Sequence, residues 1–300
     1  MIHLHPVTLS DRDWIVPITL AENSPSSDYN FGNIFLWDET YHQHVGRLGG
    51  RMISMLCYEH TPFFAWPIGS GELVPVLDEM RAFADAQGFP FVLRGVTADH
   101  LPLVESLWGA NCAVTPERDL WDYLYSAEKL DTLSGKHLHG KRNHIHRFEQ
   151  ENDWYFSPIT DGDIPVCREM LDRWMELCGE DERDGINDEY RAIQRAFRHY
   201  GALGLDGGML WSGSKLVAFS IGEMAGADTF DAHFEKAFAD INGAYTMINR
   251  EFVRYIRAIH PQVRLINRED DTGRPSLRQA KLSYHPDGMV EKYKVVLPNG

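Results

Sequence analysis

The sequence predicts a mixed α/β protein built from two modules, and three observations lead to this prediction. The chain has 300 residues, enough for about two domains of ordinary size. A strand–helix–strand pattern occurs once in each half, around helices predicted at 73–87 and 244–259. An offset of 172 residues carries Gly71 onto Gly243 without a gap, and the hydrophobic positions of the two units then coincide. We therefore expect a duplicated module.

In the first half, the predicted helix 73–87 is the clearest element. Its apolar side chains recur every three or four positions, and Gly88 is expected to end it. Short apolar runs on either side predict strands at 51–58, 63–66 and 89–93.

In the second half, the helix predicted at 244–259 has the same kind of apolar stripe. Two further amphipathic helices are expected upstream, at 164–178 and 188–200, the second with Asn187 or Asp188 as its N-cap. Apolar and alternating runs predict strands at 208–211, 215–224, 229–234 and 263–266.

Composition and charge limit the classes of function. The net charge of −15 disfavours a broad nucleic-acid surface, and no run approaches the ~20 apolar residues of a membrane span. The N-terminus lacks the features of a signal peptide. The four cysteines form no Cys-x-x-Cys pair, so we expect reduced thiols in a cytoplasmic protein.

One stretch, 134–148, is strongly basic and contains four histidines. It predicts either a solvated basic helix or an anion site, in which Lys141 and Arg142 supply charge and Asn143 supplies directional donors. Zinc binding would need an irregular backbone, because the two members of a His-x-His pair point to opposite sides of a helix.

An acidic run, 180–189, invites comparison with a calcium loop. The spacing does not fit, because with Gly185 as the sixth loop position the twelfth is Arg191, where a bidentate Glu is required. We expect a mobile acidic loop between two helices, and no metal site.

Asn242-Gly243 directly precedes the predicted helix at 244–259. A helix N-terminus attracts anions through its unpaired N–H groups and its dipole, so these residues are a candidate anion site. The alternative is a simple turn and helix cap. No Gly-x-Gly-x-x-Gly motif or P-loop occurs in the chain.

Two polar stretches accompany the predicted strands of the second half. Asp231, His233 and Glu235 alternate along one strand, so they share one side of it and either face solvent or line a cleft. Asn267, Glu269 and Asp270 follow the next strand, at the end where α/β proteins have their ligand crevice. The alternative for 267–271 is a charged surface loop.

Three stretches resemble a bacterial family of uncharacterised proteins that is similar to the C-terminal domain of phosphatidylglycerol lysyltransferase. They are FGNIFLW (31–37), LYSAEKLDTLSGKHLHGKRNHIHRF (124–148) and LINREDDTGRPSLRQAKLSYHP (265–286). The resemblance implies a tandem GNAT-like fold, with one module at 1–120 and a second at 121–300 that carries the site. Each module would be a mixed sheet flanked by helices.

The resemblance implies an acyl- or aminoacyltransferase acting on a small amine or hydroxyl. The possible donors are acyl-CoA or an aminoacyl-tRNA, and no cofactor is certain. The stretch 236–244 has a single glycine, which departs from the glycine-rich loop of CoA-binding GNAT enzymes. The alternative is a non-catalytic GNAT-derived protein that binds a ligand or partner.

In the enzyme hypothesis, Glu269 or Asp270 is the general base. Lys281 and Tyr284 position the substrate or protonate the leaving group, and the charges of 267–271 pair with Lys281 and with the basic groups around Lys141. The remaining predicted substrate-binding residues are Arg142, Asn143, His233, Asn242, Gly243 and Asn267.

Overall fold

The computed structural model describes residues 2–178 and 183–297, and their contacts divide the chain into two compact units. The first unit contains the chain up to Asp122, residues 270–275 and the chain from Met289 onward. The second contains Tyr123–Glu269 and Ser276–Gly288. The predicted duplication into 1–120 and 121–300 stays a prediction, because compactness alone does not test it.

The first unit is built on an eight-stranded sheet with the order β1-β2-β3-β4-β6-β15-β7, in which β5 pairs with β3. Its strands are β1 (His5–Pro6), β2 (His44–Leu48), β3 (Arg51–Tyr58), β4 (Thr61–Ala65), β5 (Ile68–Gly69), β6 (Val92–Thr97), β7 (Ala113–Pro116) and β15 (Lys292–Val296). Its helices are α1 (Arg12–Glu22), α2 (Phe31–Leu36), α3 (Asp38–Tyr41), α4 (Leu73–Gln87) and α5 (Leu101–Trp108).

Helix α4 has the predicted bounds, and it connects β4 to β6, which pair in parallel. Gly88 ends the helix in the left-handed region, at φ 78°. The next strand starts at Val92, three residues later than predicted. The reason is local: the N–H of Phe89 still bonds the helix at Ala84, and Pro90 has no N–H to offer a neighbouring strand.

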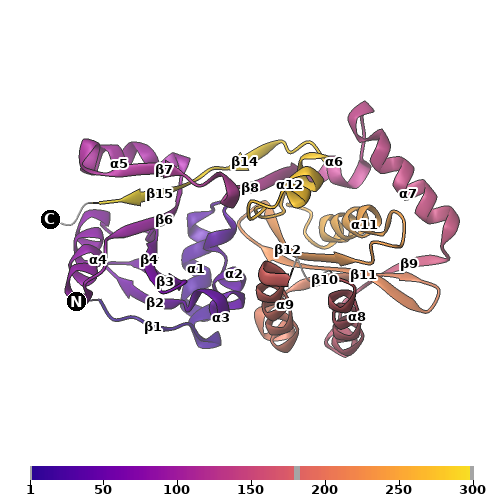
Figure 1. The fold of residues 1–300 in the computed structure, drawn as a ribbon, viewed down its shortest axis with the longest axis horizontal. Coiled ribbons are helices and arrows are strands. Elements are labelled where there is room, and N and C mark those ends of the chain that lie inside the picture. Colours follow the sequence, from indigo (N-terminus) through magenta and orange to yellow (C-terminus); the bar gives the residue numbers. More distant parts are fainter. Residues whose placement is uncertain (1, 179–182, 298–300) are drawn as a thin grey trace. The chain divides into compact units, whose positions relative to one another are not determined.

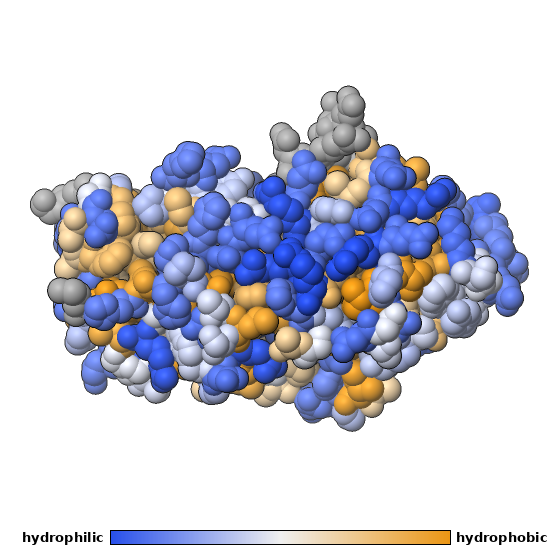
Figure 2. All heavy atoms as spheres, turned by 90° about the horizontal axis from the view of Figure 1, so that it is seen from below, coloured by the Kyte–Doolittle hydropathy of each residue, from blue (hydrophilic) through white to orange (hydrophobic). Residues whose placement is uncertain are grey.

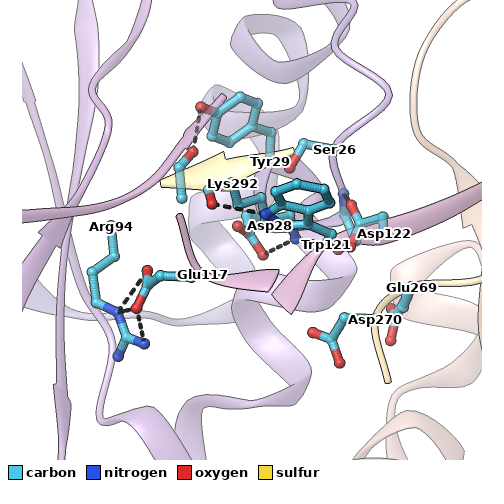
Figure 3. A network of polar contacts seen from close by, with 12 residues as sticks. Ser26, Asp28, Tyr29, Arg94, Glu117, Trp121, Asp122, Glu269, Asp270 and Lys292 are labelled. Atoms are coloured by element: carbon cyan, nitrogen blue, oxygen red, sulfur yellow. Dashed lines mark hydrogen bonds and ion pairs between the residues drawn. The ribbon is translucent and has the colours of Figure 1, made fainter. Parts of the chain in front are cut away.

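A buried lysine of the last strand joins distant parts of the first unit (Figure 3). Lys292 is 1% exposed, and its Nζ donates to Ser27 Oγ at 3.2 Å, Asp28 Oδ1 at 2.9 Å and Asp122 Oδ1 at 2.8 Å. β15 lies between β6 and β7 and is antiparallel to both. The network therefore ties the end of the chain to its first third.

The second unit is built on a seven-stranded sheet with the order β14-β8-β13-β12-β11-β10-β9. Helix α11 covers one face of this sheet, and α8 and α9 cover the other (Figure 1). The strands are β8 (Asp122–Ser126), β9 (Trp154–Pro158), β10 (Asp206–Ser212), β11 (Lys215–Met224), β12 (Thr229–Ala237), β13 (Leu265–Asn267) and β14 (Gly288–Val290). The helices are α6 (Ala127–Thr132), α7 (His139–Glu151), α8 (Ile164–Leu177), α9 (Arg183–Arg198), α10 (Tyr200–Leu203), α11 (Ala244–Ile259) and α12 (Pro275–Leu282).

Helix α11 also has the predicted bounds and connects two parallel strands, β12 and β13. Strand β12 runs on to Ala237, beyond the predicted end at 234, and β13 occupies only Leu265–Asn267. Both units thus contain a parallel strand–helix–strand crossover. In the second unit, the crossover places the stretch after β13 beside the C-terminal half of β12.

The acidic run is largely helical rather than a loop. Residues 179–182 lie outside the described part, but α9 begins at Arg183, so the loop prediction is wrong from that residue onward. Asn187 and Asp188 lie inside the helix and do not cap it. Buried Ile186 extends the apolar stripe of Ile193 and Phe197 by two turns, which favours an earlier helix start.

On the face drawn in Figure 2, hydrophilic side chains separate the apolar surface into several patches. Across residues 2–178 and 183–297, no helix is both long enough and apolar enough to cross a membrane.

Candidate functional site

An open pocket of about 490 Å³ lies in the second unit, where α7 meets the start of α11. Its lining includes Lys141 and His144 of α7, Asn242 and Gly243 of the preceding loop, and Tyr245 and Thr246 of α11. Three predicted residues from two distant stretches therefore lie together. The positive end of the α11 dipole is at this pocket, which favours an anionic ligand.

Gly243 allows the loop to approach α7 closely. Its φ is +83°, and a Cβ added there would lie 2.4 Å from the main-chain oxygen of His144. His144 Nδ1 also lies 3.3 Å from Asn242 Oδ1. Glycine at this position is explained by packing and backbone conformation, and the resulting turn positions Asn242 at the pocket.

Lys141 is the cation of this pocket. Its Nζ lies 3.8 Å from the centre of the Tyr284 ring, a cation–π contact. Among the described residues, its ammonium has no hydrogen-bond or carboxylate partner. Burial and, to a smaller extent, nearby Arg268 lower the pKa of Lys141 to about 8, against the opposing effect of Glu235. An anion in the pocket would stabilise the charged form of Lys141, which burial and Arg268 disfavour.

Tyr284 supports two cations with one ring. It is 4% exposed, and the guanidinium carbon of Arg268 lies 4.9 Å from its ring centre. Arg268 Nη2 donates to Glu235 Oε1 at 3.0 Å, while buried Nη1 has no acceptor among the described residues. Burial raises the pKa of Tyr284 to about 12 despite the opposing charge of Arg268.

A second cluster surrounds His233, whose side chain is 0% exposed. Nδ1 donates to Glu269 Oε1 at 2.8 Å, and Nε2 donates to Glu223 Oε1 at 3.2 Å. Asp231 Oδ2 lies 3.7 Å from Nδ1. The alternating stretch of β12 therefore turns Asp231 and His233 inward, and the solvent-facing alternative is wrong for these two residues.

The His233 imidazole is held in its charged form. Burial opposes the charge, but Asp231 and the bonds to Glu223 and Glu269 outweigh it and raise the pKa of His233 well above its ordinary value. Ligand atoms of Asp231, His233 and Glu269 lie within 4.8 Å of one another, a spacing that a metal ion could bridge. Both ring nitrogens already hydrogen-bond to carboxylates, and the expectation of no metal stays a prediction.

Glu269 is one of two partly exposed carboxylates of this cluster, the other being Glu223. Its side chain is 17% exposed, and its φ of +54° is unusual for a residue with a side chain. Its N–H donates to Oδ1 of buried Asn267 at 2.6 Å, and its carbonyl accepts from Tyr123 N at 3.1 Å. Asn267 therefore stabilises the turn that presents Glu269.

Lys281 contacts the main chain of the acidic stretch. Its Nζ donates to the main-chain oxygen of Arg268 at 2.5 Å, and the residue is 8% exposed. Glu269 hydrogen-bonds to His233, and Lys141 stacks on Tyr284. The predicted pairing of 267–271 with Lys141 and Lys281 stays a prediction, and the contacts described for this stretch add a buried histidine and a main-chain carbonyl to it.

Three other predicted residues make contacts that are local in the sequence. Arg142 Nη1 donates to the carbonyls of Leu133 and Gly135, which holds the turn before α7. Asn143 Nδ2 lies 3.3 Å from His139 Nε2 on the same helix. Asp270 belongs to the first unit, where its Oδ1 accepts from Thr272 N at 2.9 Å.

Sequence reasoning missed Glu223 as a site residue and left Arg268 without a role. Glu223 lies opposite Asp231 in the β11–β12 hairpin, so placing the turn at 225–228 would have revealed it. No periodicity marks Arg268, which follows β13 and meets Tyr284 only through the fold.

The chain is similar to several known proteins. The family model described as phosphatidylglycerol lysyltransferase, C-terminal, matches residues 21–296. A solved protein of unknown function from Bacteroides thetaiotaomicron VPI-5482 is 34% identical, with a TM-score of 0.94 over 99% of this chain and 100% of that one. An uncharacterised protein of Mycoplasmoides gallisepticum is 25% identical over 182 residues, which are 58% of this chain and 55% of that relative's length.

More distant structures share the fold. The C-terminal domain of a putative lysylphosphatidylglycerol synthetase from Agrobacterium fabrum is 14% identical, with a TM-score of 0.67 over 97% of this chain and 92% of that one. FemX is 10% identical, with a TM-score of 0.62 over 97% and 96%. The predicted fold class, two mixed sheets flanked by helices in tandem GNAT-like modules, is confirmed.

Proposed function

The chain belongs to the family of phosphatidylglycerol lysyltransferase C-terminal domains, and on this premise we propose that it is an aminoacyltransferase. It moves an aminoacyl group from a charged tRNA to a small amine or hydroxyl. The anionic end of the donor binds in the pocket between α7 and α11, and the acceptor loses its proton to Glu269.

The observation that carries this proposal is the environment of Lys141. A half-buried ammonium without a carboxylate partner among the described residues faces the N-terminus of a 16-residue helix. Both features attract a phosphate or carboxylate, and each is unfavourable while the pocket holds no anion. A structural lysine would instead have a carboxylate partner or point into water.

The charge around the pocket supports an RNA donor. The chain has no acidic residue between Asp131 and Glu149, although its net charge is −15. Within this stretch Lys136, His139 and Arg147 are exposed. The single glycine of the α11 loop packs against α7, so we expect acetyl-CoA to bind weakly.

The reaction needs two proton transfers. The acceptor attacks the carbonyl carbon of the aminoacyl ester, a new amide or ester bond forms, and the bond to the tRNA oxygen breaks. Glu269 takes the acceptor's proton, since it is partly exposed and was predicted as the base from its place after the strand. Lys141, with a pKa of about 8, gives a proton to the leaving oxygen.

The proposal is tested with a mixture of tRNAs charged with radioactive amino acids and a panel of small amines and alcohols. The product is an acid-stable radioactive compound of low molecular mass. We expect Glu269→Gln and Lys141→Ala to lose transfer and Lys215→Ala, an exposed lysine outside the pocket, to retain it. Lack of transfer by the wild-type protein, with Lys141-dependent anion binding intact, would instead identify a non-catalytic ligand-binding protein.

A further inference from the structure

Arg268 shares an aromatic ring with Lys141, the lysine of the pocket between α7 and α11. The guanidinium carbon of Arg268 lies 4.9 Å from the centre of the Tyr284 ring, and Lys141 Nζ lies 3.8 Å from the same centre. The two cations come from distant parts of the sequence, since Lys141 belongs to α7 and Arg268 follows β13. The fold therefore holds two like charges close together around one ring.

A carboxylate fixes Arg268 in this position. Glu235 Oε1 accepts from Arg268 Nη2 at 3.0 Å, and Glu235 Oε2 accepts from Asn249 Nδ2 at 2.9 Å. The side chains of Arg268 and Glu235 are each 13% exposed, and Asn249 is 3% exposed. Because an arginine stays protonated in proteins, this arrangement places a permanent positive charge beside Lys141.

We propose that Arg268 and Glu235 are positioning residues that set the protonation state of Lys141 through their charges. Arg268 makes the ammonium release its proton more readily. Glu235 holds Arg268 in place and limits its effect. The use of this control in catalysis rests on the proposed function, whereas the effect on Lys141 does not.

The two charges act on Lys141 in opposite directions. Burial is the largest influence that lowers the pKa of Lys141, Arg268 lowers it as well, and Glu235 raises it. The physical reason is that a like charge disfavours an ammonium and an opposite charge favours it. The pocket has further titratable side chains that stay unchanged in the variants below: His144, Asp240 and Tyr245.

Arg268 acts through Lys141 and does not contact the ligand. It is not one of the described residues that line the pocket. Its Nη1 is buried, and its Nη2 bonds to Glu235. A ligand in the pocket therefore meets the ammonium of Lys141, and Arg268 influences that ligand through the charge of the lysine.

The first arm of the test is NMR of protein labelled with ¹³C-lysine, in which comparison with Lys141→Met identifies the Lys141 signal. We expect Arg268→Gln to raise the titration midpoint of Lys141 and Glu235→Gln to lower it. Arg268→Lys keeps the positive charge and should stay near the wild type. Arg250→Gln is the matched control, because the Arg250 side chain is 12% exposed, is also ion-paired and is not among the charges that act on Lys141.

The opposite directions distinguish this role from a structural one, because general loosening would expose Lys141 and raise its midpoint in both variants. The double variant Arg268→Gln/Glu235→Gln leaves neither charge unpaired and should lie between the two single variants. An unchanged midpoint in Arg268→Gln, or a rise in both single variants, would overturn the proposal. If Arg268→Gln does not fold, Glu235→Gln decides: a lowered midpoint supports the proposal, and an unchanged or raised midpoint overturns it.

The second arm is the ratio of sulfate affinities at pH 7 and pH 9, in which a uniform change in affinity cancels. If only the charged lysine binds, a midpoint of about 8 gives a ratio of roughly tenfold in the wild type. A shift of about one pH unit would reduce the ratio to about twofold in Arg268→Gln and increase it to about fiftyfold in Glu235→Gln. Equal ratios in the three proteins would count against the proposal.

The third arm is the tRNA transfer assay. We expect Arg268→Gln to lower kcat several-fold and to move the alkaline limb of the pH–rate profile to higher pH, with Arg268→Lys restoring both. An unmoved limb would refute the use of this control in catalysis. If the wild-type protein transfers nothing, the proposed function fails, and the NMR and sulfate arms decide whether the pair sets the charge of Lys141.

Discussion

Lys141 should make anion binding depend on pH in a way that its environment predicts. Its pKa in the folded protein is lowered to about 8, so the ammonium predominates at pH 7 and is largely lost at pH 9. With this pKa, about nine-tenths of the lysine is charged at pH 7 and about one-tenth at pH 9. If only the charged form binds, the affinity for an anion falls roughly tenfold, or about 1.4 kcal/mol.

Sulfate is a suitable probe, because its own charge does not change between pH 7 and pH 9. Its affinity is measured by calorimetry at constant ionic strength, since surface electrostatics respond to salt. Lys141→Arg keeps its charge over this range and should bind sulfate with no such pH dependence. Lys141→Met should bind weakly at both pH values.

The Lys141→Met variant also controls for folding. Methionine can keep the contact with the Tyr284 ring and removes an ammonium that has no hydrogen-bond or carboxylate partner among the described residues, so Lys141→Met should raise Tm at pH 7 in buffer without anions. Equal sulfate affinity of the wild type and Lys141→Met at pH 7 would refute the reasoning, as would a wild-type affinity that is the same at pH 7 and pH 9.

Four further predictions follow from buried contacts. Gly243→Ala should lower Tm more than Gly88→Ala: both require a left-handed residue, costing about 1–2 kcal/mol, but only the first meets a main-chain oxygen at 2.4 Å. Lys292→Met should cost about 3–5 kcal/mol in urea unfolding, because it leaves a buried carboxylate without its cation; a loss below 1 kcal/mol would contradict this. Because the pKa of His233 is raised on folding, its stabilising effect should be complete below its ordinary pKa and decline as pH rises through the folded value, so the Tm difference from His233→Asn should shrink at high pH. Tyr284→Phe should retain transfer within about threefold if the ring is a cation platform, whereas loss of an essential acid costs ~10²–10⁴.

Local pattern was enough to place the two crossover helices. Both α4 and α11 have strong apolar stripes, and a glycine marks the end of one and the start of the other. Their bounds were therefore predicted correctly. The strand after α4 was placed too early. Apolar composition does not show that the N–H of Phe89 still bonds to the helix, or that Pro90 has no N–H for a neighbouring strand.

Contacts between distant segments could not be read from the sequence. Lys292 reaches carboxylates 170 and 264 residues away, and nothing in its neighbourhood marks it as buried. His233 was recognised by its alternation with Asp231, but its burial and its bonds to Glu223 and Glu269 depend on segments that are distant in the sequence. The sequence thus indicated which groups carry charge, whereas topology decided which of them meet.

The roles of Tyr284 and Lys141 illustrate the difference between residue type and environment. A tyrosine in a charged stretch is a reasonable candidate for an acid, and Tyr284 was predicted to position the substrate or to protonate the leaving group. Burial raises its pKa to about 12, whereas burial lowers the pKa of Lys141 to about 8. A general acid works best when its pKa is near the operating pH. The fold thus makes the tyrosine a weaker acid and the lysine stacked on it a stronger one, so in the proposed reaction we assign the leaving-group proton to Lys141 and a supporting role to the Tyr284 ring.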